Sequence, residues 1–151
     1  MIDLKQLASP ILLQGDAHTA YRDPAVFFHD GRFYLYFTLV ETEPDGRVFL
    51  AMTTTTDLLT FTPVKKLSVR DQALNFSSPG NIIRFGGRFC LCCQTYCRPN
   101  GEKYGTADSR IFLMRSDDLM NWDAPELLRV KGDEVPREEM GRMIDPYLLE
   151  D

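Results

Sequence analysis

The sequence predicts an all-β fold built from a repeated unit of four antiparallel strands. Short runs of β-branched and aromatic residues alternate with glycine-containing turns, and an internal repeat of about 55 residues recurs along the chain. The chain has 151 residues, of which 44% are hydrophobic, so it is long enough to bury one core of ordinary size. These observations favour repeated β-sheets over a helical or mixed fold.

The first copy of the repeat occupies residues 21–70. It begins at Arg22-Asp23-Pro24 and turns at Asp30-Gly31, which is a strong hairpin signal. The second strand is apolar on both faces, as in a sheet packed between two other sheets. A polar turn that begins at Asp57 places Phe61 between the last two strands. The four strands are expected at residues 22–28, 32–38, 47–53 and 62–67.

The second copy occupies residues 71–130 and follows the same order. The prolines Pro24 and Pro79 lie 55 residues apart, whereas Asp57 and Asp118 lie 61 apart, because the second copy carries extra residues in the loop 99–108. Its hairpin turn is expected at residues 85–87. The four strands are expected at residues 77–83, 88–95, 109–116 and near 127–128.

The repeated unit has the features of a β-propeller blade, since it is a four-stranded sheet buried on both faces. Residues 1–20 are then a leader or closing strand, and residues 131–151 are a charged loop followed by the first strand of a third blade. A lone β-sandwich is the alternative, but it does not predict this repeat. Even four blades need about 220 residues, so we expect part of a propeller, whose exposed apolar blade faces support a homo-oligomer.

Charge and hydropathy exclude several kinds of partner. Seventeen Lys and Arg against 22 Asp and Glu give a formal net charge of −5, which argues against nucleic acid or an anionic membrane and favours a neutral or cationic small ligand. No apolar run approaches the roughly 20 residues of a membrane span, and the N-terminus lacks the layout of a signal peptide. A cytoplasmic protein is therefore expected.

The cysteines indicate reduced thiols. A disulfide framework spreads its cysteines over distant segments, whereas these four lie in one largely apolar stretch. Their C-x-C-C-x3-C spacing has no paired C-x-x-C half-sites and no nearby histidine, so no metal site is expected at the cysteines. No cofactor is expected either. The four residues are Cys90, Cys92, Cys93 and Cys97.

Three residues that precede prolines are the strongest candidates for chemistry. Asp23, Ser78 and Asp145 each stand at the start of an innermost strand. Proline biases the preceding residue to an extended backbone, and in a propeller the three side chains would ring one mouth of a central funnel. Two carboxylates in a shared cavity suit acid and base catalysis on a glycosidic bond. Asp-Pro also opens ordinary turns, which is the competing interpretation.

From Tyr21 to Asp151 the chain resembles the five-bladed propeller glycosidases. The nearest is family 43 of the glycoside hydrolases, which includes β-xylosidases, α-L-arabinofuranosidases and arabinanases. The resemblance is carried by Asp23-Pro24 before a hydrophobic strand, by the Ser-x-Asp-Leu-x-x-Trp turn at residues 116–122, and by Ile144-Asp145-Pro146. Arg22-Asp23-Pro24 is also similar to a string in the fructan- and sucrose-cleaving propellers of family 32.

The resemblance implies roles for two residues. Asp23 matches the general base and Asp145 the aspartate that tunes and orients the acid. It also implies a glutamate acid from blade four, with acid and base carboxyls roughly 6.5–9.5 Å apart and inversion at the anomeric carbon. No residue here matches that acid, and Glu102, Glu138 and Glu139 are poor substitutes, so the isolated chain is expected to be inactive.

The other candidates are residues that would contact the sugar. These are His18, Tyr21, Arg22, Ser78 and Tyr96, with Arg98 and Tyr104 beside the loop of the second copy. By contrast, Phe61 and Trp122 occupy equivalent positions in the repeat, which favours packing within the blades over stacking on a sugar. The leading hypothesis is an inverting glycosidase acting on pentose glycans. The alternatives are a non-catalytic carbohydrate-binding or oligomerising module, and a fructan- or sucrose-type glycosidase.

Overall fold

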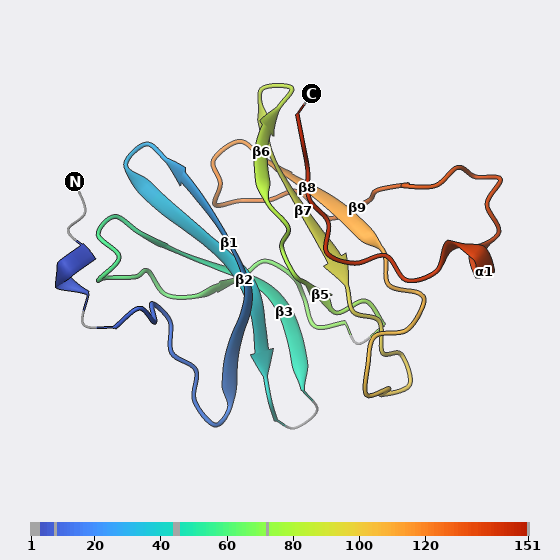
Figure 1. Cartoon of the computed structure of the whole chain (residues 1–151), viewed down its shortest axis with the longest axis horizontal. Coiled ribbons are helices and arrows are strands. Elements are labelled where there is room, and N and C mark those ends of the chain that lie inside the picture. The colour runs from blue at the N-terminus through green and yellow to red at the C-terminus, as the bar shows by residue number, and fades with distance from the viewer. Residues whose placement is uncertain (1–3, 8, 44–45, 72, 151) are drawn as a thin grey trace.

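The computed structural model describes residues 4–7, 9–43, 46–71 and 73–150. Figure 1 shows two antiparallel sheets that lie next to each other, with the C-terminal segment running along the second. The first sheet is a meander in the order β1-β2-β3-β4. Its strands are β1 (Thr19–His29), β2 (Arg32–Glu41), β3 (Arg47–Thr55) and β4 (Lys65–Lys66).

The second sheet repeats this plan with a divided first strand. Two short strands, β5 and β6, both pair with β7 and together occupy the place that β1 has in the first sheet. The chain then continues through β8 and β9 in meander order. The strands are β5 (Phe76–Ser77), β6 (Ile82–Phe85), β7 (Arg88–Thr95), β8 (Ile111–Ser116) and β9 (Glu126–Leu127).

The predicted all-β class and antiparallel pairing are confirmed. Both fourth strands form where they are expected, but each is only two residues long. The hairpin turns also match, because Asp30-Gly31 and Gly86-Gly87 all adopt positive φ, as a two-residue turn between twisted strands requires. The repeat in the sequence is therefore also a repeat in the backbone.

The turns that begin at Asp57 and Asp118 fold in the same way. Each carboxylate accepts hydrogen bonds from two backbone N–H groups, those of Leu59 and Thr60 in the first sheet and of Met120 and Asn121 in the second, at 2.7 to 2.9 Å. These N–H groups hold the pKa of both carboxyls below the ordinary value. The equivalent leucines Leu58 and Leu119 both have positive φ.

The backbone expected before the prolines is wrong. Asp23, Ser78 and Asp145 have φ values of 52°, 41° and 56°, in the left-handed region instead of the extended one. At Asp23 the cause is a β-bulge, since the pairing with β2 shifts between Arg22 and Ala25. The same local turn at Ser78 separates β5 from β6. Non-glycine residues adopt this conformation only where the surrounding structure holds them in it.

The main core lies between the two sheets. Tyr36 is fully buried, and its hydroxyl donates a 2.7 Å hydrogen bond to the carbonyl of Leu119 in the other sheet. Burial raises the pKa of Tyr36 above its ordinary value. The Trp122 ring meets Tyr36 edge-on at 5.6 Å, so Trp122 packs in the core, as predicted. The other large core side chains are Leu50, Met52, Leu91 and Met114.

A second cluster lies on the opposite face of the first sheet. Leu35, Phe37 and Phe49 are buried there, and Leu12 and Leu13 of the leader pack against them. Both faces of β2 are therefore packed, as its continuous apolar sequence predicts. Phe61 packs against this cluster. Further out on β1, Val26 and Phe28 are 56% and 58% exposed. The four cysteines are free and buried.

The C-terminal segment runs beside the second sheet (Figure 1) without forming the expected strand, since residues 141–150 have no regular secondary structure. Its backbone bonds to side chains instead: Asn81 donates to the Leu148 carbonyl at 2.9 Å and accepts from the Leu148 N–H at 2.7 Å. The approach is close at Gly80, where an added Cβ would lie 1.9 Å from the Pro146 carbonyl oxygen. Only glycine fits there.

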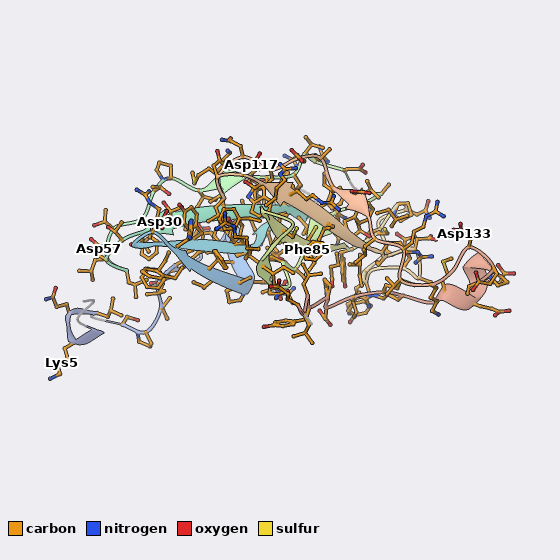
Figure 2. The ribbon with its side chains drawn as sticks, turned by 90° about the horizontal axis from the view of Figure 1, so that it is seen from above. Lys5, Asp30, Asp57, Phe85, Asp117 and Asp133 are labelled. Atoms are coloured by element: carbon orange, nitrogen blue, oxygen red, sulfur yellow. The ribbon has the colours of Figure 1, made fainter. Side chains whose placement is uncertain are left out.

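The two ends of the molecule carry its short helices. The turn η1 (Leu4–Gln6) belongs to the leader, and α1 (Arg137–Met140) lies in the charged loop before the C-terminal segment. Figure 2 shows Lys5 of η1 and Asp133 of this loop at opposite ends of a flattened molecule. Among the described residues, no helix has the length and apolar character needed to cross a membrane.

Candidate functional site

A cavity of about 510 Å³ lies where the two sheets and the C-terminal segment meet. Each of these three parts contributes its residue before proline, so Asp23, Ser78 and Asp145 all line it. The β2–β3 hairpin and the loop 96–104 contribute further walls. The remaining lining residues are Arg22, Thr38, Val40, Gly46, Val48, Ser77, Gln94, Tyr96, Arg98, Lys103, Tyr104, Arg142 and Ile144.

The Asp23 carboxylate is held by two hydroxyl groups. Its Oδ2 accepts hydrogen bonds from Thr38 Oγ1 at 2.8 Å and from Ser78 Oγ at 3.0 Å. Thr38 comes from β2 of the same sheet and Ser78 from the neighbouring sheet. Among the described residues, no group donates to Oδ1. One oxygen of the carboxylate is thus fixed, and the other is available to a water molecule or a substrate hydroxyl.

Two equivalent hydrogen bonds, each from a backbone N–H to a side-chain oxygen, join successive parts of the chain at the cavity. The Ser78 N–H donates to Thr38 Oγ1 at 2.7 Å, and the Asp145 N–H donates to Gln94 Oε1 at 2.6 Å. Thr38 and Gln94 are equivalent residues of β2 and β7, and both are almost completely buried. Ser78 and Asp145 are therefore each anchored by the second long strand of the preceding repeat.

One wall of the cavity, called the basic wall below, combines aromatic rings with basic side chains. The guanidinium groups of Arg98 and Arg142 lie 5.9 and 5.1 Å from the centre of the Tyr96 ring. Lys103 Nζ lies 5.2 Å from the centre of the Tyr104 ring. Arg98 Nη2 also donates to the Gly46 carbonyl at 2.7 Å, which ties this wall to the β2–β3 hairpin.

Seven of the nine predicted site residues line the cavity, and two do not. The seven are Arg22, Asp23, Ser78, Tyr96, Arg98, Tyr104 and Asp145. His18 precedes β1 and is exposed, with its Nδ1 3.9 Å from Glu43 Oε2. Tyr21 packs edge-on against Phe37 at 5.3 Å on the opposite face of the first sheet. His18 and Tyr21 therefore do not line this cavity.

Several lining residues were not predicted from the sequence, among them Thr38, Gln94, Lys103 and Arg142. Thr38 and Gln94 lie 56 residues apart, the same spacing as Phe33 and Phe89, so the repeat offers a signal for them. Lys103 and Arg142 have no such signal, since each comes from a loop whose path is set by tertiary contacts. Among the residues that the structure describes, no group of three or more His, Cys, Asp or Glu side chains is suited to a metal ion.

Comparison with known proteins shows a likeness of fold. No protein-family profile and no curated protein matches the chain. Among solved structures, the catalytic domain of a family 62 α-L-arabinofuranosidase from Coprinopsis cinerea is similar with a TM-score of 0.52 and 20% identity, over 76% of this chain and 34% of that one. A family 43 endo-arabinanase from Bacillus licheniformis gives 0.52 and 16%, over 77% and 39%.

A third similar structure belongs to glycoside hydrolase family 130, with a TM-score of 0.50 and 14% identity over 72% of this chain and 31% of that one. Its family is described as mannoside phosphorylases with hydrolases that target β-1,2 mannosidic linkages in Candida mannan. The chain thus spans roughly a third of the length of these structures. At such low identity the likeness concerns the fold alone: the two sheets are arranged as in part of several glycoside hydrolases.

Proposed function

We propose that the chain belongs to an inverting glycoside hydrolase of the five-bladed propeller type, related to family 43. The cavity between the repeats is its saccharide site. Asp23 is the general base, and Asp145 is the carboxylate that tunes and orients the general acid. The observation that carries the proposal is the convergence of Asp23, Ser78 and Asp145 on one cavity of about 510 Å³.

The geometry around Asp23 supports the role of a base. The two hydroxyls on Oδ2 hold the carboxylate in one orientation. The left-handed backbone at Asp23 is the kind of strained conformation that recurs at functional sites. Leu58 and Leu119 share that conformation in purely structural turns, so the strain supports the proposal only together with the cavity.

The chemistry follows from these positions. Asp23 Oδ1 accepts a proton from a water molecule, whose oxygen attacks the anomeric carbon of the bound glycoside. The glycosidic bond breaks in the same displacement, and its oxygen leaves with a proton from a general acid, so the configuration inverts. We assign no acid among the described residues, because Glu102, Glu138 and Glu139 do not line the cavity.

Glycosyl fluorides test this proposal, since fluoride leaves with far less help from an acid than an alkoxide does. We expect the chain to release fluoride from β-D-xylosyl or α-L-arabinofuranosyl fluoride and to give the inverted sugar, observed by NMR. Asp23→Asn should lower the rate by about 100-fold or more, which is the usual contribution of a general base. Asp30→Asn, in an exposed hairpin turn, is the matched control and should leave the rate unchanged.

Two outcomes would contradict the proposal. Fluoride release that Asp23→Asn leaves unchanged would remove Asp23 from the role of base. Binding of xylobiose in the cavity without turnover of either fluoride would favour the non-catalytic carbohydrate-binding module.

A further inference from the structure

We propose that the cavity takes an acidic saccharide and that Arg142 and Lys103, with Arg22 and Arg98, bind the carboxylate of its sugar. This inference rests on the proposed function, because it names the substrate class of the same site. It departs from the neutral or cationic ligand that the overall charge of −5 favours.

The charge of the cavity is opposite to that of the whole chain. Four basic side chains line it, against the two carboxylates Asp23 and Asp145. Local charge, and not net charge, sets the potential that a bound ligand experiences at such short range. A ligand with a negative group is therefore favoured on the basic wall.

Three of these four basic side chains have no ion-pair partner among the described residues. Within the described part of the chain, Arg22, Lys103 and Arg142 make no ion pair with a carboxylate, whereas several other exposed arginines do. Arg88 bonds both Asp117 and Asp123, for example. Unpaired guanidinium groups are well suited to a carboxylate because they donate two parallel hydrogen bonds to it.

Arg98 differs from the other three basic residues because it has an acidic neighbour, Glu102, and a buried Nε. Glu102 interacts electrostatically with Arg98, and its carboxylate accepts hydrogen bonds from the backbone N–H and the side-chain amide of Asn100 at 3.1 and 3.0 Å. It is therefore already engaged by neutral donors. Arg98 Nε is buried and has no hydrogen-bond partner among the described residues, so one N–H donor of this arginine is unpaired.

The aromatic rings favour a sugar acid over a small inorganic anion. Tyr96 lies close to both Arg98 and Arg142, and Tyr104 beside Lys103 is 64% exposed. A sugar ring can pack its C–H face on such rings while its carboxylate meets the basic groups. Inorganic phosphate would use the charges alone, and it is the competing source of the same oxyanion chemistry.

Binding measurements on the whole chain test the inference without requiring turnover. We would titrate digalacturonate, its dimethyl ester, xylobiose and inorganic phosphate by calorimetry at low ionic strength. Digalacturonate should bind about tenfold or more tightly than its ester, and this preference should shrink in 0.5 M salt, because salt screens partly exposed charges. Arg142→Gln and Lys103→Gln should each weaken digalacturonate binding about three- to tenfold and leave binding of the ester unchanged.

The controls separate the possible failures. Arg84→Gln removes an exposed arginine outside the cavity and should leave the affinity for digalacturonate unchanged. Equal affinity for digalacturonate and its ester, or an equal loss of both in Arg142→Gln, would overturn the acidic saccharide. Phosphate binding as tight as digalacturonate binding would overturn the sugar as the source of the anion. If no saccharide binds at all, the proposed function itself fails.

Discussion

The backbone N–H of Asp145 donates a 2.6 Å hydrogen bond to the side-chain Oε1 of Gln94, 51 residues earlier in the chain. The bond from Ser78 to Thr38 repeats it one unit earlier at 2.7 Å. Ser78 and Asp145 are thus each docked on the preceding sheet by a buried polar side chain. The repeated bond explains how three distant parts of the sequence reach one cavity.

Thr38→Val tests this docking directly. Valine has nearly the same shape as threonine but loses the hydroxyl that accepts from Ser78 and donates to Asp23. The free energy of unfolding should fall by about 1–3 kcal/mol, the cost of leaving buried polar groups unpaired. Urea unfolding measures it. Thr38→Ser keeps the hydroxyl and should lose less than about 1 kcal/mol; equal stability of the valine variant and the wild type would contradict the account.

Tyr36→Phe tests the contact between the sheets. The substitution leaves the Leu119 carbonyl without its buried donor, so we expect a loss of about 1–3 kcal/mol in urea unfolding. Tyr34 lies two residues away on the same strand, and its hydroxyl makes no hydrogen bond with the described residues. Tyr34→Phe should therefore change stability by less than about 0.5 kcal/mol. A similar effect of both substitutions would show that the hydrogen bond does not join the sheets.

Gly80→Ala tests the position of the C-terminal segment. An added Cβ would lie 1.9 Å from the Pro146 carbonyl oxygen, so the segment must move away. Amide hydrogen exchange at Asp145 and Leu148 should then become faster, while exchange in β2 and β3 stays slow. Gly86→Ala places its Cβ in open space and should leave exchange at these two residues unchanged. Slow exchange in Gly80→Ala would mean that the segment does not pack there.

The paired turns predict how stability depends on pH. Backbone N–H groups lower the pKa of Asp57 and Asp118 in the folded state, so the unfolded chain binds more protons as the pH falls below about 4. Their stabilisation is present above that pH and is lost as the pH falls through the folded pKa values. Urea midpoints should drop between pH 6 and pH 3, and the double variant Asp57→Asn/Asp118→Asn should flatten the drop. An unchanged slope would contradict this origin.

Much of the fold could be predicted because its determinants are local and repeated. The Asp30-Gly31 and Gly86-Gly87 turns, the apolar strand 32–38 and the Asp57 and Asp118 turns each express the chemistry of neighbouring residues. The left-handed backbone at Asp23 could not be predicted in this way, since the β-bulge that imposes it depends on the register of β1 against β2.

The candidate site was predicted in part for the same reason. Asp23, Ser78 and Asp145 share one place in the repeat, and the repeat brings them to one cavity. Tyr21 lies outside this cavity because the register of β1 turns its side chain to the opposite face of the sheet. Arg142 follows a loop without periodicity, so only the three-dimensional path of the chain reveals that it joins the basic wall.

The most direct test of the account is a map of where a saccharide binds to this chain. Amide NMR spectra recorded during titration with xylobiose and digalacturonate should show shifts concentrated at Asp23, Ser78, Gln94, Tyr96 and Asp145. Arg142→Gln should reduce the shifts that digalacturonate causes. A separate cavity of about 270 Å³ is lined by Leu127 and Val130. Shifts confined to that cavity, or no shifts with either saccharide, would contradict the claim that the cavity between the repeats is a carbohydrate site.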